Sequence, residues 1–404
     1  MNRVGKESRR TYTTIGLCFV VALLEGMDLQ SAGIAAPGMA AQFGLSSTMM
    51  GAVFSASILG LLPGALGGGW LADRIGRKRV LIGAVVLFGL FSIATALVWD
   101  LNSLLAARFL TGVGLGAALP NLIALSSEAA DARSRGTAVS LMYCGVPLGG
   151  ALAALVGMAG FASGWKAVFY VGGVAPLLVA PLLVLCLPES AAFRAQQNAR
   201  GGPRASLWQG LFQEGAAMPT LLLWISYFFT LMVVYMLLNW LPSLLVGQGF
   251  TRPQAGMVQI LFNLGGATGS LLLGLLLDRW RPLALVALTY AGILAALAGL
   301  GLSTAFVSML LAGFAAGFFA IGGQLVLYAL APLFYPTAVR ATGVGAAVAV
   351  GRLGSMSGPL VAGQMLAMGT GATGLLLASA PGVVVAAAAV FYLLGQRRAE
   401  GVTA

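Results

Sequence analysis

The chain contains no histidine, few charges and few cysteines. Only 8% of its 404 residues are charged, against roughly 25% in an average soluble domain. The three cysteines, Cys18, Cys144 and Cys186, all fall within apolar runs, so they predict neither a disulfide framework nor a metal site. The lack of histidine excludes histidine-based hydrolysis and histidine proton relays. Any proton handling must therefore depend on carboxylates.

Long apolar runs, in contrast, fill most of the sequence, and 59% of the residues are hydrophobic. A run of about 18 or more apolar residues is long enough to cross a bilayer as a helix. The first run is too long and too acidic for a cleaved signal peptide. We therefore expect an all-α membrane protein with twelve transmembrane helices. The predicted spans are residues 13–36, 48–71, 79–98, 103–127, 136–159, 165–187, 218–245, 254–277, 282–300, 305–330, 341–366 and 372–395.

The net charge of +11 is distributed unevenly over the connections between these spans. Eighteen of the 22 Lys and Arg residues lie on one side of the membrane if the spans alternate in direction. Only Lys166 and Arg252 lie on the other side, and Arg108 and Arg352 lie inside spans. By the positive-inside rule, both termini are expected in the cytoplasm. The basic excess thus predicts topology and not nucleic-acid binding.

One long polar connection, residues 188–217, separates two groups of six spans. We expect an N-terminal six-helix bundle over residues 1–187 and a C-terminal bundle over residues 218–404. The connection between them is predicted to be a cytoplasmic linker, because it follows an even number of spans from a cytoplasmic N-terminus.

The two halves are related by an internal repeat. Sliding one half over the other places Asp73 and Arg74 on Asp278 and Arg279, and several glycines on glycines. The charged matches are harder to obtain by chance than glycine matches in a chain with 57 glycines. Two parallel repeats of six helices are the architecture of the major facilitator superfamily, whose central site lies between the halves near the membrane midplane.

Two acids, Glu25 and Asp28, lie inside the first predicted span. A carboxylate at that depth costs about 2.5–3.5 kcal/mol on insertion scales, and such residues typically serve proton or ion movement. The spacing places both on one helical face. A rise of about 1.5 Å per residue brings Asp28 and Arg108 to similar heights in the membrane. The sequence predicts a proton-sensitive Asp28–Arg108 pair; a static pair that only fixes helix packing is the alternative.

Arg352 is the basic residue deep in the second half. A guanidinium at this depth needs an anionic partner, which is either a carboxylate on the substrate or Glu25. An aromatic seventh span and a few buried polar groups would suit an aromatic ring bearing hydroxyls, although single aromatic residues are more often interfacial. The candidate substrate-binding residues are Arg352, Arg108, Tyr328, Tyr143, Gln324, Asn239 and Asn263.

The loop after the second span reads Gly-x-x-x-Asp-Arg-x-Gly-Arg-Lys from Gly69 to Lys78. This pattern is similar to the signature between helices 2 and 3 of the major facilitator superfamily. An acid beside a basic turn can engage a helix N-terminus or an arginine of the other half, and so close the cytoplasmic side. The alternative is a basic loop that only sets topology. The predicted gating residues are Asp73, Arg74, Arg77, Asp278 and Arg340.

Over essentially its full length, the chain resembles the aromatic acid:proton symporter family of this superfamily, and within it the bacterial 3-(3-hydroxyphenyl)propionate transporters. The family motif Asp-Gly-x-Asp of the first helix stands here as Glu25-Gly26-Met27-Asp28. The resemblance implies proton-coupled uptake of an aromatic carboxylate across the bacterial cytoplasmic membrane by alternating access, and essential roles for Asp28, Arg108 and Arg352. The proton gradient would supply the energy without a cofactor, and a monomer is the family expectation. Glu25 in place of aspartate leaves the site of protonation open.

Two other functions are alternatives to uptake. A proton-coupled exporter is the first, because Gly136, Gly145 and Gly149 match the spacing of a helix-5 motif of drug antiporters. Gly150 stands where that motif has proline, which counts against export. A membrane enzyme or receptor is the second. The sequence offers no nucleophile–histidine pair, metal cluster or soluble sensory domain for it, and the repeat favours a transporter.

Overall fold

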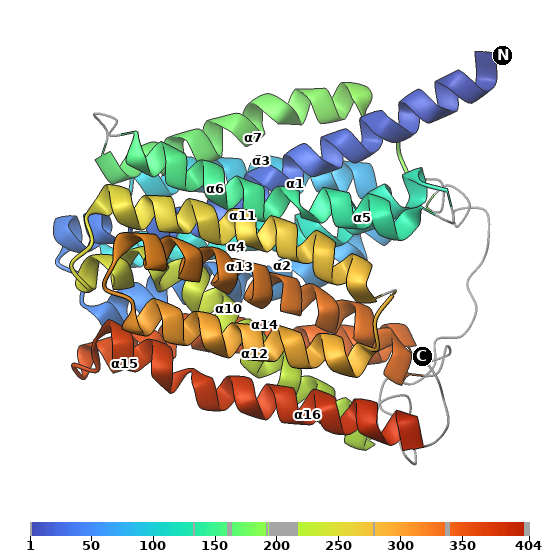
Figure 1. The fold of residues 1–404 in the computed structure, drawn as a ribbon. Helices are drawn as coiled ribbons and strands as arrows, with labels where there is room; N and C mark the ends of the chain where they lie inside the picture. The colour runs from blue at the N-terminus through green and yellow to red at the C-terminus, as the bar shows by residue number, and fades with distance from the viewer. Residues whose placement is uncertain are drawn as a thin grey trace. The chain divides into compact units, whose positions relative to one another are not determined.

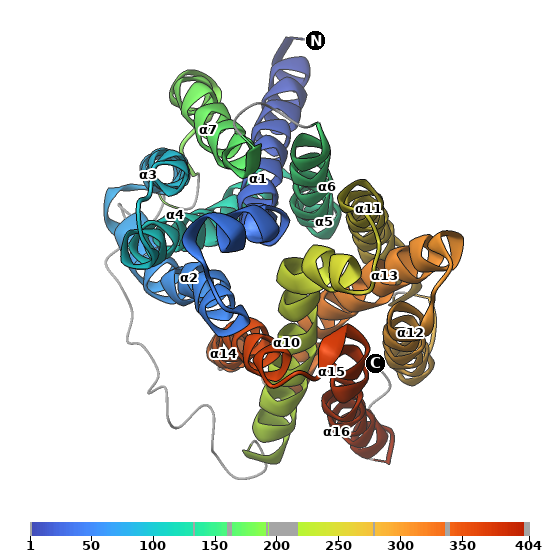
Figure 2. The same ribbon diagram turned by 90° about the vertical axis from the view of Figure 1, so that its left-hand side faces the viewer.

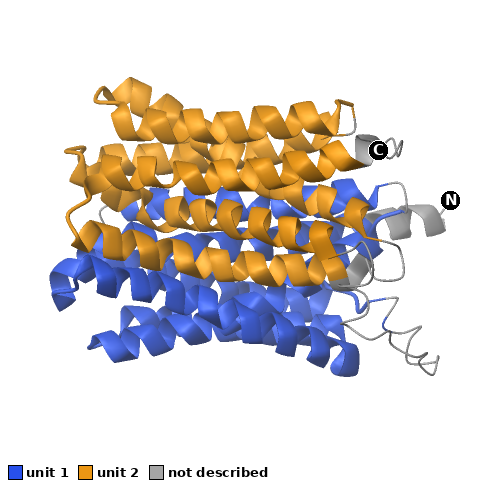
Figure 3. Ribbon diagram, turned by 90° about the horizontal axis from the view of Figure 1, so that it is seen from below, with its two compact units in different colours: residues 1–201 blue, residues 202–404 orange. Residues whose placement is uncertain are grey.

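The computed structural model describes residues 2–131, 134–159, 164–190, 193, 217–277, 279–335 and 340–399. Within these residues, twelve helical segments are long and apolar enough to cross a membrane, which confirms the predicted all-α class. Contacts divide the chain into two compact units, Met1–Gly201 and Gly202–Ala404, coloured separately in Figure 3. The predicted linker, residues 188–217, lies largely outside the described residues.

Unit 1 is a bundle of helices that run side by side (Figure 1). Seen end on in Figure 2, α1 lies beside α6 and α3 beside α7. Within α1 the helix continues through Pro37, well past the predicted end at Ala36. The elements are α1 Asn2–Phe43, α2 Ser47–Ile75, α3 Arg77–Ala96, α4 Leu101–Ala129, α5 Arg135–Tyr143, α6 Gly145–Met158, the 3₁₀ turn η1 Gly164–Lys166 and α7 Ala167–Cys186.

Unit 2 repeats this arrangement. The pairs α10–α14, α11–α13, α12–α13 and α12–α16 take the places of α1–α6, α2–α4, α3–α4 and α3–α7. The elements of unit 2 are α10 Ala217–Gly247, α11 Arg252–Leu277, α12 Pro282–Leu302, α13 Phe306–Leu330, the 3₁₀ turn η2 Ala331–Phe334, α14 Arg340–Ala367, α15 Gly371–Ala378 and α16 Ala380–Ala399.

Close backbone contacts recur in both units at positions matched by the sequence repeat. A Cβ atom added to Gly60 would lie 2.1 Å from the carbonyl oxygen of Phe109, and one added to Gly265 would lie 2.1 Å from that of Phe314. The alignment that places Asp73 on Asp278 also places the first of these pairs on the second. Because only glycine permits such an approach, small residues let these membrane helices pack backbone to backbone. The repeat inferred from the sequence is therefore a repeat of helix contacts.

Two predicted spans are each divided by proline. The fifth span breaks at Cys144, between α5 and α6, and the last breaks at Ser379, between α15 and α16. Pro147 and Pro381 follow these breaks closely. A proline cannot donate a hydrogen bond to the carbonyl four residues earlier, and its ring crowds that carbonyl. The carbonyl affected by Pro147 is that of Tyr143, and the one affected by Pro381 is that of Leu377.

The start of α4 is fixed by a reciprocal cap outside the membrane span. The Asp100 carboxylate accepts from the backbone N–H of Ser103 at 2.8 Å, and the Ser103 hydroxyl lies 3.1 Å from the backbone nitrogen of Asp100. Such a cap satisfies N–H groups that lack partners within the helix. The hydrogen bonds from the Ser103 side chain and backbone hold the pKa of Asp100 below its usual value. Arg108 is thereby held two turns into the helix.

Candidate functional site

The predicted approach of Asp28 and Arg108 is present in unit 1. Arg108 Nη1 lies 3.1 Å from Asp28 Oδ2, and Arg108 Nη2 lies 3.3 Å from the Ser57 hydroxyl on α2. The exposed fractions are 1% for the Arg108 side chain and 0% for that of Asp28. The ring of Phe169 on α7 lies 5.6 Å from the guanidinium carbon. Four helices thus enclose one ion pair away from water.

The second oxygen of Asp28 has a different partner. Ser92 on α3 donates its hydroxyl to Asp28 Oδ1 at 2.7 Å. Glu25 lies one turn earlier on α1 and is also buried, with 3% of its surface exposed. Neither Ser92 nor Ser57 was among the predicted site residues. A serine within an apolar helix carries no signal of its own, because its hydroxyl usually bonds to its own backbone.

Glycines bring the helices around Asp28 close together. A Cβ atom at Gly26 would lie 1.8 Å from the carbonyl oxygen of Val146 on α6. One at Gly149 would lie 1.8 Å from the carbonyl oxygen of Leu23. The glycine between the two acids of α1 therefore has a structural reason: it allows backbone contact with α6, while Asp28 contacts side chains of α3 and α4.

The described part of unit 2 lacks this polar cluster. The sequence repeat places Val233, Gly313 and Leu297 at the positions equivalent to Asp28, Arg108 and Ser92. The helices that carry them still make the same pairwise contacts. The fold of a six-helix unit therefore does not depend on an ion pair at this position.

In unit 2, Arg352 lies on α14 and donates to the Tyr235 hydroxyl of α10 at 2.6 Å. Gln324 and Tyr328, both predicted site residues, form a second pair in which Gln324 Nε2 donates to the Tyr328 hydroxyl at 2.9 Å. The ring of Tyr328 packs against that of Tyr227, with centroids 5.6 Å apart. Tyr235 lies in the aromatic seventh span and was not among the predicted binding residues.

Three other predicted binding residues take no part in the two side-chain hydrogen bonds just described. The amide groups of Asn239 and Asn263 are buried and donate to carbonyl oxygens of their own helices, those of Tyr235 and Gln259. Such bonds are typical of polar side chains inside a membrane helix. Tyr143 is half-buried at the end of α5.

The basic loop after α2 takes part in a charged cluster. Arg77 pairs with Glu128 at the end of α4, and Glu128 accepts from the Ser190 hydroxyl at 2.5 Å. Glu189 accepts from the backbone nitrogen of Lys78 at 3.0 Å. The cluster joins the start of α3 to the end of α4 and to the segment after α7. Glu128 and Glu189 were not among the predicted site residues. Both nevertheless follow predicted spans on the side of the membrane to which the basic loop is assigned.

Of the other predicted gating residues, the structure describes the side chains of Asp73 and Arg74. Asp73 is exposed, and the guanidinium of Arg74 stacks on Trp70 at 3.7 Å. Asp278 lies outside the described residues. Arg340 begins α14, but its side chain also lies outside the described part of the chain.

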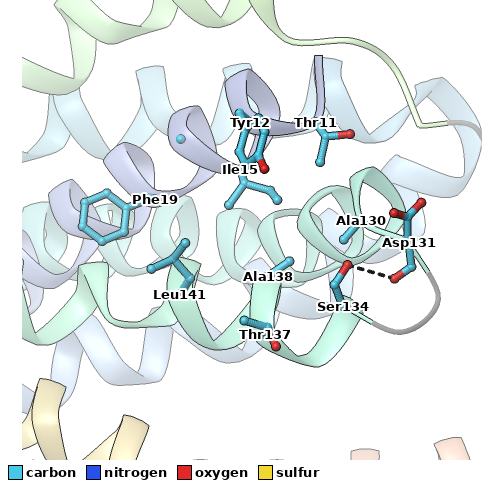
Figure 4. A pocket seen from close by; sticks show the side chains of 11 residues that line it. Thr11, Tyr12, Ile15, Phe19, Ala130, Asp131, Ser134, Thr137, Ala138 and Leu141 are labelled. Atoms are coloured by element: carbon cyan, nitrogen blue, oxygen red, sulfur yellow. Dashed lines mark hydrogen bonds between the residues drawn. The ribbon is translucent and has the colours of Figure 1, made fainter. Parts of the chain in front are cut away.

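A pocket of about 840 Å³ opens at the N-terminal end of α1, away from Asp28. Figure 4 shows Tyr12, Ile15 and Phe19 of α1 along one wall, with α5 opposite. The turn before α5 adds Asp131, whose backbone carbonyl accepts from Ser134 at 3.3 Å. No cationic side chain is among the lining residues that the structure describes.

Known proteins similar to this chain are consistent with its architecture. The family model described as Major Facilitator Superfamily matches residues 18–359 and 223–403. The chain is 62% identical to the 3-(3-hydroxy-phenyl)propionate transporter of Escherichia coli K12, over 97% of this chain and 96% of the relative. It is 36% identical to the 4-hydroxybenzoate transporter PcaK of Pseudomonas putida, over 90% and 88%.

The solved structure of the xylose transporter XylE from E. coli in an inward open conformation has a similar fold. The TM-score is 0.78 at 19% identity, and the match covers 95% of each chain. The family model covers most of the chain. The 3-(3-hydroxy-phenyl)propionate and 4-hydroxybenzoate transporters match the chain over nearly its full length. The chain therefore belongs to the Major Facilitator Superfamily and is a multi-pass membrane transporter, not an enzyme.

Proposed function

We propose that this transporter carries 3-(3-hydroxyphenyl)propionate, or a close hydroxylated phenylpropionate, into the bacterial cell together with protons. The observation that carries the substrate is the 62% identity over nearly the full length to a transporter of that compound. Transporters of 4-hydroxybenzoate and gallate among the relatives, at 36% and 37% identity, support the wider class of hydroxylated aromatic carboxylates.

The proton is assigned to Asp28, with Glu25 as the second acid. Both carboxyl groups are buried inside a membrane span, and neutralisation by a proton removes the cost of burying the charge. Arg108 keeps its charge at any physiological pH, so a protonated Asp28 would leave it in need of another anion. Proton binding at Asp28 therefore changes the electrostatics of the five helices that contribute side chains to this cluster, α1, α2, α3, α4 and α7.

The substrate carboxylate is assigned to Arg352. Its guanidinium donates to the Tyr235 hydroxyl, a neutral acceptor, and a substrate carboxylate would accept a stronger, charge-assisted hydrogen bond from the same group. The hydroxyl of the substrate ring would meet Gln324 and Tyr328, which supply both donors and acceptors. Asp73, Arg74 and Arg77, together with Asp278 and Arg340 of the second half, would close the cytoplasmic side when the carrier faces outward.

The test is transport in proteoliposomes with labelled 3-(3-hydroxyphenyl)propionate. An inward proton gradient should drive accumulation above the equilibrium level, and collapse of the gradient should abolish it. Accumulation that ignores the gradient would contradict symport, and efflux driven by an inward gradient would favour the exporter. Benzoate and cinnamate as competitors would define the ring and chain requirements.

A binding measurement tests the anion site separately. Arg352→Gln should weaken substrate binding by at least about tenfold, because a hydrogen bond to a charged group contributes about 1.5–3 kcal/mol. Arg252→Gln, at the exposed start of α11, is the matched control and should bind normally. Unchanged affinity in Arg352→Gln would assign the carboxylate to another cation.

A further inference from the structure

Ser92 faces two acceptors at once. Its hydroxyl oxygen lies 2.7 Å from Asp28 Oδ1 and 3.2 Å from the backbone carbonyl oxygen of Phe169 on α7. The residue is fully buried on α3. A serine hydroxyl has one hydrogen to donate and two lone pairs with which to accept. It can therefore donate its hydrogen to either acceptor, but it makes a full-strength hydrogen bond to only one of them at a time.

The two oxygens of Asp28 are divided between two kinds of partner. Oδ2 lies against Arg108, which can only donate. Oδ1 lies against Ser92, which can both donate and accept. A proton on Oδ2 would point at a fixed positive charge, whereas a proton on Oδ1 can be donated to the serine oxygen. Of the two oxygens, Oδ1 is therefore the one with a partner suited to both protonation states.

We propose that Ser92 is the positioning residue for the transported proton, and that its hydroxyl reverses direction each time Asp28 changes protonation state. With Asp28 ionised, Ser92 donates to Oδ1. When a proton from the external water binds Oδ1, the new Asp28 hydroxyl donates to Ser92, and Ser92 turns its own hydrogen to the Phe169 carbonyl. The O–H bond formed on Asp28 replaces an O–H bond broken in a hydronium ion of the external water, and no other covalent bond changes. This proposal rests on the proposed proton coupling at Asp28.

The turn of the hydroxyl has space beside Gly172 of α7. A Cβ atom at this position would lie 3.3 Å from Ser92 Oγ and 3.9 Å from Asp28 Oδ1. An added Cβ would therefore crowd the Ser92 hydroxyl, whereas its distance from Asp28 is an ordinary van der Waals contact. The reversal links α1, α3 and α7 without movement of the backbone, because both acceptors already lie within hydrogen-bond distance of Ser92.

The charged neighbours of Asp28 within the membrane are few. Arg108 of α4 contacts it, and Glu25 precedes it by one turn on α1. The facing helices α2, α3, α6 and α7 carry charged residues in their described parts only near one end, at Asp73 to Arg79. Tyr170 on α7 is the remaining titratable group on those four helices, apart from Cys186 at the far end of α7.

The equivalent position in unit 2 shows that the helices pack without this serine. Leu297 takes the place of Ser92 and is buried between helices in the same pairing. Since α12 packs on α13 and α16 with leucine there, a hydroxyl at Ser92 is not a requirement of the architecture. Its presence beside the acid of unit 1 points to a role in the chemistry of that acid.

The experiment measures exchange of labelled 3-(3-hydroxyphenyl)propionate in proteoliposomes held at the same pH on both sides, over a range of pH. Ser92→Ala should raise the pH midpoint of exchange by about half to one unit, because a hydrogen bond to an ionised group is worth about 1 kcal/mol more than one to a neutral group. Ser92→Thr keeps the hydroxyl and should restore the wild-type midpoint. Thr95→Val, which removes a hydroxyl bonded only to its own helix, should leave the midpoint unchanged.

An unchanged midpoint in Ser92→Ala, with a pH-dependent wild type, would overturn the role of Ser92 and leave symport intact. A wild type without pH dependence would instead overturn the proposed proton coupling. Infrared difference spectra of the purified protein between high and low pH give a second readout that needs no transport. The band of the Asp28 carboxylic acid is the one that is absent in Asp28→Asn. Its frequency should shift in Ser92→Ala and return to the wild-type value in Ser92→Thr. A frequency that does not shift in Ser92→Ala also overturns the proposal.

Discussion

Asp28 and Arg108 form an ion pair in the interior of a membrane-spanning bundle, where neither side chain reaches water. Removing two charges from water costs several kcal/mol per ion, and their attraction often only compensates for that cost. Such a pair is weak grounds for a stabilising role. Because Val233 and Gly313 fill the equivalent positions of unit 2, the pair is better explained by a function that requires charge, such as binding and release of a proton.

Substitutions at the pair should separate stability from coupling. Asp28→Asn leaves Arg108 buried without a counter-ion, which costs about 3–5 kcal/mol, so the melting temperature should fall and proton-driven accumulation should be lost. Arg108→Gln should lower the melting temperature similarly. The double variant removes both charges. Its melting temperature should therefore return much of the way to the wild-type value, while proton-driven accumulation should remain absent.

Thermal unfolding in detergent and accumulation in proteoliposomes are the two measurements. The interaction term of the double-mutant cycle gives the coupling between the two residues. Wild-type accumulation by Asp28→Asn would contradict the assignment of the proton to Asp28 and would direct attention to Glu25.

At the level of helices, the units are held by backbone contacts through glycine. A Cβ atom at Gly112 of α4 would lie 1.9 Å from the carbonyl oxygen of Ser57, and one at Gly317 of α13 would lie 1.7 Å from that of Phe262. These two contacts are again equivalent under the sequence repeat. Both carbonyls belong to helix backbones that cannot yield without moving the helix.

Gly112→Ala and Gly317→Ala should therefore destabilise their units to a similar degree. Overpacking costs about 1–3 kcal/mol, which corresponds to a fall in melting temperature of roughly 2–12 °C for a domain of this size. The matched controls are Gly67→Ala on α2 and Gly274→Ala on α11, where an added Cβ meets nothing within 4 Å. Equal melting temperatures for the contact and control variants would show that the helices separate easily and that the glycines are dispensable.

For the whole molecule, the sequence predicts the depth of each residue in the membrane better than it predicts the rotation of each helix about its own axis. Spans and topology follow from apolar length and the distribution of Lys and Arg, which act without regard to packing. The approach of Asp28 and Arg108 could be predicted because buried charges are rare and the rise per residue is constant. Only the rotation of α3 decides that Ser92 faces Asp28, and this rotation depends on contacts between many apolar side chains.

The same reasoning explains what was missed in unit 2. Arg352 was identified as a charge at depth, but its partner Tyr235 is one of several aromatic residues on α10, and nothing in the sequence distinguishes the one that faces α14. The break at Cys144 was missed for a different reason. Many membrane helices, including α1 with Pro37 and α10 with Pro242, continue through proline, so proline alone does not predict a break.

The orientation of the whole chain is a prediction that rests on charge. If the spans alternate in direction, eighteen of 22 basic residues fall on the side of the two termini, and such a bias sets orientation during insertion. A green fluorescent protein fused after residue 404 should fluoresce in bacterial cells, and alkaline phosphatase fused at the same point should be inactive because it stays in the cytoplasm. Phosphatase fused after residue 250, between α10 and α11, should be active. Active phosphatase at the C-terminus would reverse the topology, and the charged cluster around Arg77 would then lie on the external side, where it could not gate release into the cytoplasm.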